Sequence, residues 1–272
     1  MPADALALAL SAAILHAVWN LLLAGARDSQ AATAVALIAC ALTGAVAAPF
    51  DWDADASVWP YVFASVVLEL SYFALLGAAY HRAALSVVYP LARGLAPVLV
   101  LVGTVAFTAA RTSAPQVVGV CLVAGGLLLV RGLRRADATG AGFGLAIACC
   151  IAAYTVVDKH GVAHASPVAY NALVTAPIAL VYAPSMALLR GRAALRSELH
   201  PRIVVAGIFT FAAYALVLAA LRLAPAASVA AVRETSVLIA TALAAFVLRE
   251  RVTVWRLGGA ALVVGGVALI SA

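Results

Sequence analysis

The chain consists of apolar runs that are each about as long as a membrane is thick, and this pattern limits the folds it can adopt. Short polar breaks separate the runs, and the longest break in the middle of the chain lies between Arg131 and Gly140. A helix needs about 20 apolar residues to cross the hydrocarbon core of a bilayer. The runs therefore predict an all-α integral membrane protein with ten transmembrane helices, at residues 4–25, 31–50, 58–80, 84–109, 115–131, 141–158, 166–189, 202–222, 226–248 and 253–271.

Composition excludes a soluble domain and argues against a nucleic-acid-binding protein. Hydrophobic residues make up 66% of the chain and charged residues only 10%, which is far from the balance of a soluble protein. The net charge of +6 comes from arginines that lie singly or in short groups between apolar runs, where membrane proteins place them. The four cysteines lie within apolar runs, so they predict neither a disulfide framework nor a metal site. We expect no metal, no cofactor and no nucleic-acid partner.

The arginines also predict how the chain sits in the membrane. The odd-numbered connections between the predicted spans hold twelve arginines, whereas the even-numbered connections hold three basic residues. Basic residues favour the cytoplasmic side of a membrane. Both termini are therefore expected outside the cytoplasm, and we expect the protein in a bacterial inner membrane.

The two halves of the chain resemble each other, most clearly toward the end of each half. An offset of 140 residues pairs Arg93 with Arg233, Gly119 with Gly259 and Gly126 with Gly266. Because each half holds an odd number of helices, the second half enters the membrane from the opposite side. We expect two inverted five-helix repeats, residues 1–132 and 141–272, joined by a connecting loop at residues 133–140. Symmetry of this kind is typical of transporters.

The run from residue 86 to residue 98 places a cation inside an apolar helix. Helical spacing puts Ser86, Tyr89 and Arg93 on one face. Pro90 and Pro97 lack the N–H groups that would bond to the carbonyls of Ser86 and Arg93. Free carbonyls are tolerated at membrane depth only where protein or a water-filled cavity satisfies them. This helix is therefore expected to line a cavity.

The chain resembles a ten-helix member of the EamA-type drug/metabolite transporter superfamily. The resemblance covers essentially the whole chain and is carried by His16-Ala-Val-Trp-Asn20, by Ser86-Val-Val-Tyr-Pro-Leu-Ala-Arg-Gly94, and by Arg233-Glu-Thr-Ser236 with Leu248-Arg-Glu-Arg251. It implies a secondary transporter whose central cavity is lined by helices 1, 3, 4, 6, 8 and 9, with helices 5 and 10 outside. It implies no particular substrate. His16 stands where small four-helix relatives have an essential glutamate, so their proton site does not carry over.

Four ionisable side chains lie deep within the predicted spans, where they are functional candidates by default. Glu69 shares a face of its helix with Ser65, Tyr72 and Tyr80. Arg233 and Glu234 are sequence neighbours whose side chains diverge by about 100°, so we expect each to find a partner elsewhere. The charges of Arg93, Arg233, Glu69 and Glu234 cancel, which predicts that each arginine pairs with one of the two carboxylates. Such pairs could also serve only to lock the helix bundle.

Glu69 and Glu234 are the candidates for proton coupling. A buried carboxylate can hold a proton, whereas an arginine effectively never releases one. A carboxylate that binds either a proton or a cationic substrate would make the protein a proton antiporter. With an anionic substrate, Arg93 or Arg233 would be the docking charge instead.

Further cavity candidates lie on helices 1, 6 and 8. His16, Trp19 and Asn20 give the first helix a polar and aromatic face, although a buried structural histidine is an alternative. Tyr154 and Tyr214 are the candidates on the sixth and eighth spans. Asp158 follows Tyr154 by four residues but falls at the predicted membrane end, so we assign it to an interfacial cluster.

These features predict a secondary transporter that exports a small metabolite by alternating access, with proton coupling as an option. The expected partners are the small-molecule substrate and the lipid bilayer, while the oligomeric state stays open. An integral-membrane enzyme is one alternative, but the sequence offers no metal-ligand spacing and no nucleophile beside a base. A membrane scaffold that transports nothing is the other, and it would leave the deep charges without a purpose.

Overall fold

The computed structural model describes residues 1–108, 112–131, 138–248 and 254–271. These residues form α-helices joined by short connections, with two 3-10 turns at Ala48–Phe50 and Ala56–Val58. The α-helices are α1 (Ala3–Ala24), α2 (Ser29–Ala47), α3 (Trp59–Arg82), α4 (Leu85–Thr108), α5 (Ala114–Arg131), α6 (Ala138–Gly161), α7 (Pro167–Leu189), α8 (Arg192–Ser197), α9 (Pro201–Leu223), α10 (Ala226–Arg233), α11 (Thr235–Leu248) and α12 (Val254–Ser271).

The helices are those of an integral, multi-pass membrane protein. Among the described residues, seven helical stretches are long and apolar enough to cross a membrane, judged by length and composition. Two further apolar helices, at 114–130 and 257–271, are shorter. The all-α membrane class is therefore confirmed, while the ten spans and their inverted repeat stay predictions.

Polar residues at the helix starts explain several boundaries. Asp28 caps α2 by accepting hydrogen bonds from the backbone N–H groups of Gln30 and Ala31, at 3.0 and 3.1 Å. Ser166 caps α7 in the same way through the N–H of Ala169. Side chains of this kind satisfy N–H groups that the first helical turn leaves free. Helix α2 accordingly begins at Ser29 and ends at Ala47, slightly ahead of the predicted span 31–50.

The predicted ninth span, residues 226–248, is not one continuous helix. The structure divides it into α10 and α11 at Glu234. There the N–H of Glu234 bonds to the carbonyl of Ala231, and the N–H of Val237 bonds to that of Glu234. Bonds that span three residues tighten the turn relative to an α-helix. Arg233 Nη2 and Glu234 Oε1 lie 4.0 Å apart at this junction, whereas Glu234 has its closer partner on another helix, as expected, in Arg93 at 3.0 Å.

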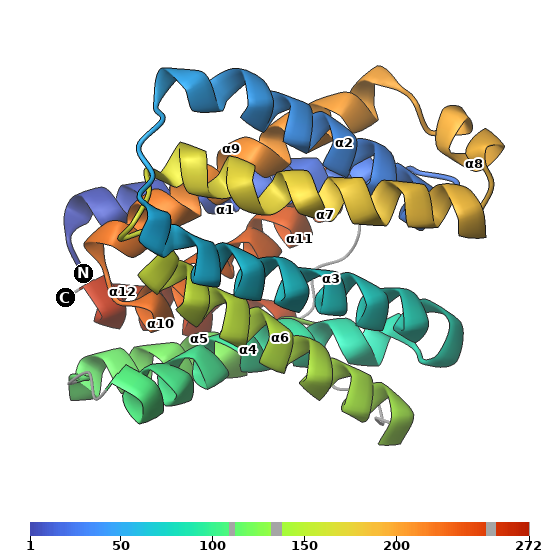
Figure 1. Ribbon diagram of the computed structural model, residues 1–272. Coiled ribbons are helices and arrows are strands. Elements are labelled where there is room, and N and C mark those ends of the chain that lie inside the picture. Colours follow the sequence, from blue (N-terminus) through green and yellow to red (C-terminus); the bar gives the residue numbers. More distant parts are fainter. Residues whose placement is uncertain (109–111, 132–137, 249–253, 272) are drawn as a thin grey trace.

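The helices form two groups with a central layer between them. Figure 1 shows α2, α7 and α9 on one side, and α3, α4 and α6 on the other. Helix α1 packs against α9, α10 and α11, and α10 also packs against α4. This arrangement brings the polar faces of α1, α3 and α4 toward the middle of the bundle.

Helices α5 and α12 pack closely against each other through glycines. A Cβ atom at Gly119 would lie 2.7 Å from the carbonyl oxygen of Gly266. A Cβ atom at Gly126 would lie 2.6 Å from the carbonyl oxygen of Gly259. Only glycine allows the two backbones to come this close. The order of these contacts makes the two helices antiparallel.

Candidate functional site

A cavity of about 540 Å³ lies between the helices. Its described lining comes from α1, α2, α3, α4, α7, α9 and α11. Arg93 and His16 lie at its inner part, and Ala24, Ser29 and Tyr80 line it where α1 ends, α2 begins and α3 ends. Tyr80 is 43% exposed, so the cavity reaches the end of the bundle that carries the α1–α2 connection. A space of this size suits a small molecule.

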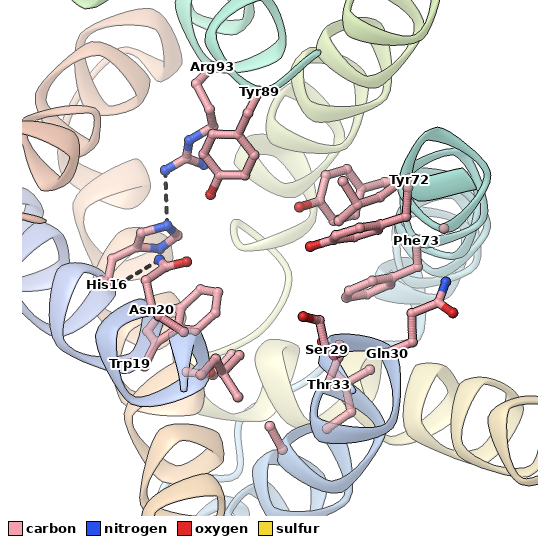
Figure 2. Close-up of a pocket in the computed structure, with 18 of the residues that line it drawn as sticks. His16, Trp19, Asn20, Ser29, Gln30, Thr33, Tyr72, Phe73, Tyr89 and Arg93 are labelled. Atoms are coloured by element: carbon pink, nitrogen blue, oxygen red, sulfur yellow. Dashed lines mark hydrogen bonds between the residues drawn. The ribbon is translucent and has the colours of Figure 1, made fainter. Parts of the chain in front are cut away.

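Arg93 and His16 meet across the inner part of the cavity (Figure 2). Arg93 Nη2 donates to His16 Nε2 at 2.9 Å, and Asn20 Nδ2 donates to the carbonyl of His16 at 2.8 Å. A guanidinium group has donors only, so His16 Nε2 is the acceptor and the neutral ring carries its proton on Nδ1. The edge of the His16 ring also packs against Trp19, with ring centroids 4.8 Å apart.

Arg93 lines the cavity, and behind it lie further buried charges. Arg93 Nε lies 3.0 Å from Glu234 Oε2, and Arg233 Nη2 lies 4.0 Å from the other oxygen of the same carboxylate. The side chains of Arg93 and Glu234 are 11% and 1% exposed. The predicted pairing of Arg93 with one of the two glutamates is therefore present, and the partner is Glu234.

A second group of polar side chains surrounds Asp158, which is fully buried. Tyr170 donates its hydroxyl proton to Asp158 Oδ1 at 2.8 Å, and Tyr214 donates to Oδ2. Ser65 and Glu69 of α3 lie near this carboxylate and interact with it. The prediction that Asp158 belongs to an interfacial cluster is therefore wrong. The span was expected to end at Asp158, but α6 continues to Gly161 and neighbouring helices cover the side chain.

Asp158 also changes the charge balance of the interior. Three carboxylates, Glu69, Asp158 and Glu234, now stand against the two arginines Arg93 and Arg233. The four-residue set that was expected to sum to zero is therefore incomplete. Within the described part of the chain, no three His, Cys, Asp or Glu side chains gather so as to hold a metal ion.

The predicted site residues divide into two groups in the structure. The first group lines the cavity and comprises His16, Trp19, Asn20, Tyr72, Tyr89 and Arg93. The second group does not appear in the lining and comprises Glu69, Tyr154, Tyr214, Arg233 and Glu234, which lie in the charged interior behind it. Ser86 falls in α4, but its side chain lies outside the described ones.

The expected set of cavity helices needs correction. Helix α6 contributes no described lining residue, whereas α2 contributes Ser29, Gln30 and Thr33, and α7 contributes Tyr182. Ser29 and Gln30 fall outside the predicted span 31–50 and were not among the predicted site residues. A run of three polar residues in five was the available signal, and its helical spacing puts Ser29 and Thr33 on one face.

The end of the bundle opposite the cavity is closed by contacts between two connections. Ala54 and Ala165 form an isolated antiparallel bridge. The N–H of Asp55 bonds to the carbonyl of His164 at 3.0 Å, and the N–H of Ser166 bonds to that of Asp53 at 2.6 Å. The His164 ring stacks on Tyr61, with centroids 5.4 Å apart. The α2–α3 connection and the α6–α7 connection are thus joined.

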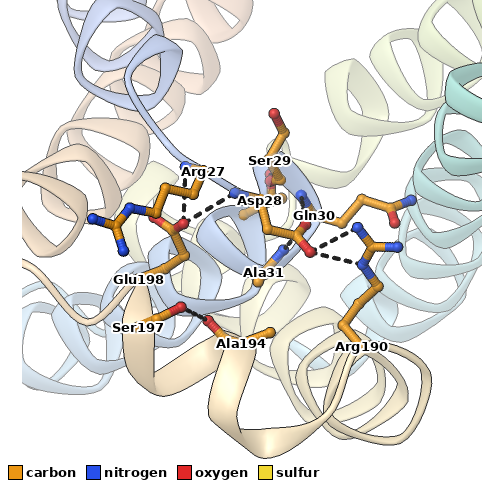
Figure 3. A network of polar contacts seen from close by, with 10 residues as sticks. Arg27, Asp28, Ser29, Gln30, Ala31, Arg190, Ala194, Ser197 and Glu198 are labelled. Carbon is orange, nitrogen blue, oxygen red and sulfur yellow. Dashed lines mark hydrogen bonds and ion pairs between the residues drawn. The ribbon is translucent and has the colours of Figure 1, made fainter.

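The cavity end has its own polar network, which lies on the rim (Figure 3). The backbone N–H groups of Arg27 and Asp28 both donate to Glu198 Oε1, at 2.9 and 3.0 Å. Asp28 also pairs with Arg190, whose Nη2 lies 2.7 Å from Oδ2. These contacts fix the α1–α2 connection against the segment that precedes α9, and they leave the space between α1 and α3 open (Figure 2).

Comparison with known proteins identifies one family and one fold. The model of the EamA-like transporter family matches residues 138–272. A solved structure described simply as "Crystal structure of protein" superposes with a TM-score of 0.79 at 17% sequence identity, covering 99% of this chain and 96% of that chain. At this identity the likeness concerns the fold alone. No curated protein matches the sequence.

Proposed function

Because this chain belongs to the EamA-like transporter family, we propose that it is a secondary transporter in which two inverted five-helix repeats move a small metabolite by alternating access. The observation that carries the proposal is the cavity. It reaches one end of the bundle, while contacts between the α2–α3 and α6–α7 connections close the other end. One open end and one closed end are what a carrier has in one of its two states.

The glycine contacts between α5 and α12 support the inverted repeat. The offset of 140 residues pairs Gly119 with Gly259 and Gly126 with Gly266. Exchanging the two halves therefore converts the contact between Gly119 and Gly266 into the contact between Gly259 and Gly126, which the structure also contains. A two-fold pseudo-symmetry axis between the repeats requires this reciprocity. The reciprocal glycine contacts fit a division of the chain into two repeats, residues 1–132 and 141–272.

The charge at the cavity end supports the proposal of export. The connections and helix ends on that side include Arg27, Arg82, Arg190 and Arg202, and basic residues favour the cytoplasmic side. The cavity then faces the cytoplasm, and both termini lie on the far side. In this state the protein would take up a solute from inside the cell, in a bacterial inner membrane.

The interior charges support coupling to protons, with Glu69 as the proton site. Three carboxylates and two arginines are neutral together only when one carboxylate carries a proton. Glu234 lies between Arg93 and Arg233, and Asp158 accepts two tyrosine hydroxyls. Both arrangements stabilise the ionised form. Oxygens of both Glu69 and Glu234 are buried without a hydrogen-bond partner, but Glu234 Oε2 lies 3.0 Å from Arg93 Nε. Among the described residues Glu69 has no ion-pair partner within 4.0 Å, so Glu69 is the carboxylate on which we place the proton.

Transport in proteoliposomes under an imposed pH gradient tests this function. Purified protein would be scanned with pooled amino acids, organic anions and cationic dyes. We expect gradient-driven movement of one class, loss of that movement in Glu69→Gln, and retention of substrate exchange without a gradient. Asp4→Asn, an exposed carboxylate at the start of α1, is the matched control. If no pool moves although the protein is folded, the proposal fails; if Glu69→Gln still accumulates solute, proton coupling at Glu69 fails.

A further inference from the structure

The cavity wall is electrostatically one-sided. None of the described side chains that line it is an aspartate or a glutamate. Apart from tyrosines, its ionisable lining groups are Arg93 and His16, and His16 is neutral because Arg93 donates to its Nε2. A solute in the cavity therefore meets a fixed positive charge and no fixed negative charge. A cation would face Arg93 with nothing in the wall to balance its own charge.

Arg93 retains donors for a solute. Its guanidinium has five N–H groups. One N–H group bonds to His16 through Nη2, while Nε lies 3.0 Å from Glu234 Oε2 in an ion pair that is not a hydrogen bond. The side chain is 11% exposed and lines the cavity, so the solute can reach the remaining N–H groups. The proton on His16 Nδ1 is a further donor in the same wall.

Glu234 balances Arg93 from behind the cavity wall and does not itself line the cavity. One carboxylate is shared by two guanidinium groups, at 3.0 and 4.0 Å. Glu69 and Asp158 both interact electrostatically with Arg233. Arg93 is thus the cation of this group that lines the cavity, and an anion beside it would complete its coordination.

Aromatic rings make up a large part of the remaining wall. Six rings line the cavity, those of Trp19, Tyr72, Phe73, Tyr80, Tyr89 and Tyr182. Trp19 packs beside His16, and Phe73 packs against both Tyr72 and Tyr182. Figure 2 shows Trp19 on α1 and Tyr72 with Phe73 on α3, on opposite sides of the space. Rings placed in this way bury a flat apolar group well.

On the basis of the proposed transport function, we infer that the solute is a small organic anion with a flat apolar body, such as an aromatic carboxylate. Its anionic group binds the free N–H groups of Arg93 beside His16. Its apolar body lies between the aromatic side chains of α1 and α3. A charge-assisted, planar pair between a guanidinium and a carboxylate is one of the stronger polar contacts in proteins.

Direct binding to the purified protein tests the inference with four probes that vary the ring and the charge separately. Phenylacetate carries the ring and the anion, phenylacetamide has the ring without the charge, phenethylamine has the ring with a cation, and acetate has the anion without the ring. By isothermal titration at neutral pH, phenylacetate should bind about tenfold or more tightly than phenylacetamide. Phenethylamine and acetate should bind more weakly still.

Variants identify the group that gives the preference. Arg93→Gln alone leaves buried Glu234 with only the more distant Arg233, at 4.0 Å, so the double variant Arg93→Gln/Glu234→Gln removes both charges together. In a folded double variant, the preference for phenylacetate over phenylacetamide should disappear. Arg192→Gln, on the exposed helix α8, should keep the preference unchanged and serves as the control.

Three results would overturn the inference. They are tighter binding of phenylacetamide or phenethylamine than of phenylacetate, a preference for phenylacetate that survives the double variant, and no binding of phenylacetate at millimolar concentration. The proteoliposome assay separates this failure from failure of the transport function. Gradient-driven movement of a neutral or cationic solute would support the transport function and contradict only the inference that the substrate is an anion.

Discussion

Arg93 on α4 and Glu234 at the junction of α10 and α11 form an ion pair of 3.0 Å in which the carboxylate side chain is 1% exposed. The pair links the first half of the chain to the second. It lies directly behind the cavity wall, because Arg93 lines the cavity and Glu234 does not. Breaking it should therefore affect both stability and transport.

Removing only one partner of this pair should destabilise the protein more than removing both. Arg93→Ala takes the nearer of two guanidinium groups from a buried carboxylate and leaves only Arg233 at 4.0 Å; breaking a buried pair in this way costs about 3–5 kcal/mol in soluble proteins. Arg93→Met/Glu234→Gln avoids that cost, so we expect a higher melting temperature for the double variant than for the single one. Thermal unfolding in detergent, with size-exclusion chromatography, measures this. Equal melting temperatures for the two variants would show that loss of Arg93 adds no cost from the charge of buried Glu234.

Locking the closed end should stop transport if access alternates. Ala54 and Ala165 form an antiparallel bridge, and residues opposed in this way have Cα atoms about 4.5–5.5 Å apart, within reach of a disulfide. Ala54→Cys/Ala165→Cys should crosslink under oxidation and lose transport, and reductant should restore it. The native cysteines would first be replaced by alanine, at positions Cys40, Cys121, Cys149 and Cys150.

Each single cysteine variant is the control for this experiment, because it cannot form the bridge within one chain. Full transport by the crosslinked protein, with crosslinking verified by mass spectrometry, would mean that this end does not open during the cycle.

Adding one methyl group to the α5–α12 contact should have an effect that depends on which of two adjacent glycines receives it. At Gly126 a Cβ would lie 2.6 Å from the carbonyl oxygen of Gly259, whereas nothing lies within 4 Å of a Cβ at Gly125. Gly126→Ala should lower stability by about 1–3 kcal/mol, and Gly125→Ala should be neutral or slightly stabilising. Thermal unfolding compares them, and equal effects would contradict the close helix contact.

The rim contact between Asp28 and Arg190 should make stability depend on pH. Partial burial raises the pKa of Asp28, but the Ala31 N–H, Arg190 and the Gln30 N–H together hold it below its ordinary value. A carboxyl with a lowered pKa stabilises the fold above its ordinary pKa, and this contribution is lost as pH falls through the folded value. Asp28→Asn should therefore lower the melting temperature at pH 7 and much less at about pH 3.

Asp28→Ala separates charge from helix capping. It removes the acceptor for the N–H groups of Gln30 and Ala31, which costs about 1 kcal/mol beyond the loss of charge. This extra loss should be the same at both pH values. A difference between the wild-type protein and Asp28→Asn that does not change with pH would exclude the ionic contribution.

Much of the fold followed from local sequence. Apolar runs of membrane length predicted the helices to within a few residues, because hydrocarbon forces the backbone to satisfy its hydrogen bonds within each segment. Charges inside those runs marked Arg93, Glu69, Arg233 and Glu234 as interior residues, since lipid contact would be costly. The α10–α11 break was not predicted, because neither proline nor glycine occurs within residues 226–248 to mark it.

What the sequence determined by itself is which side chains must avoid lipid, and the periodicity of a helix even indicates that Tyr89 and Arg93 share a face. Only the tertiary structure decided what that face meets. It placed Glu234 rather than Glu69 against Arg93, buried Asp158 under Tyr170 and Tyr214, and brought the start of α2 into the cavity wall. The reason is that a residue's own helix fixes the direction in which its side chain points. The side chains that it contacts belong to helices far away in the sequence.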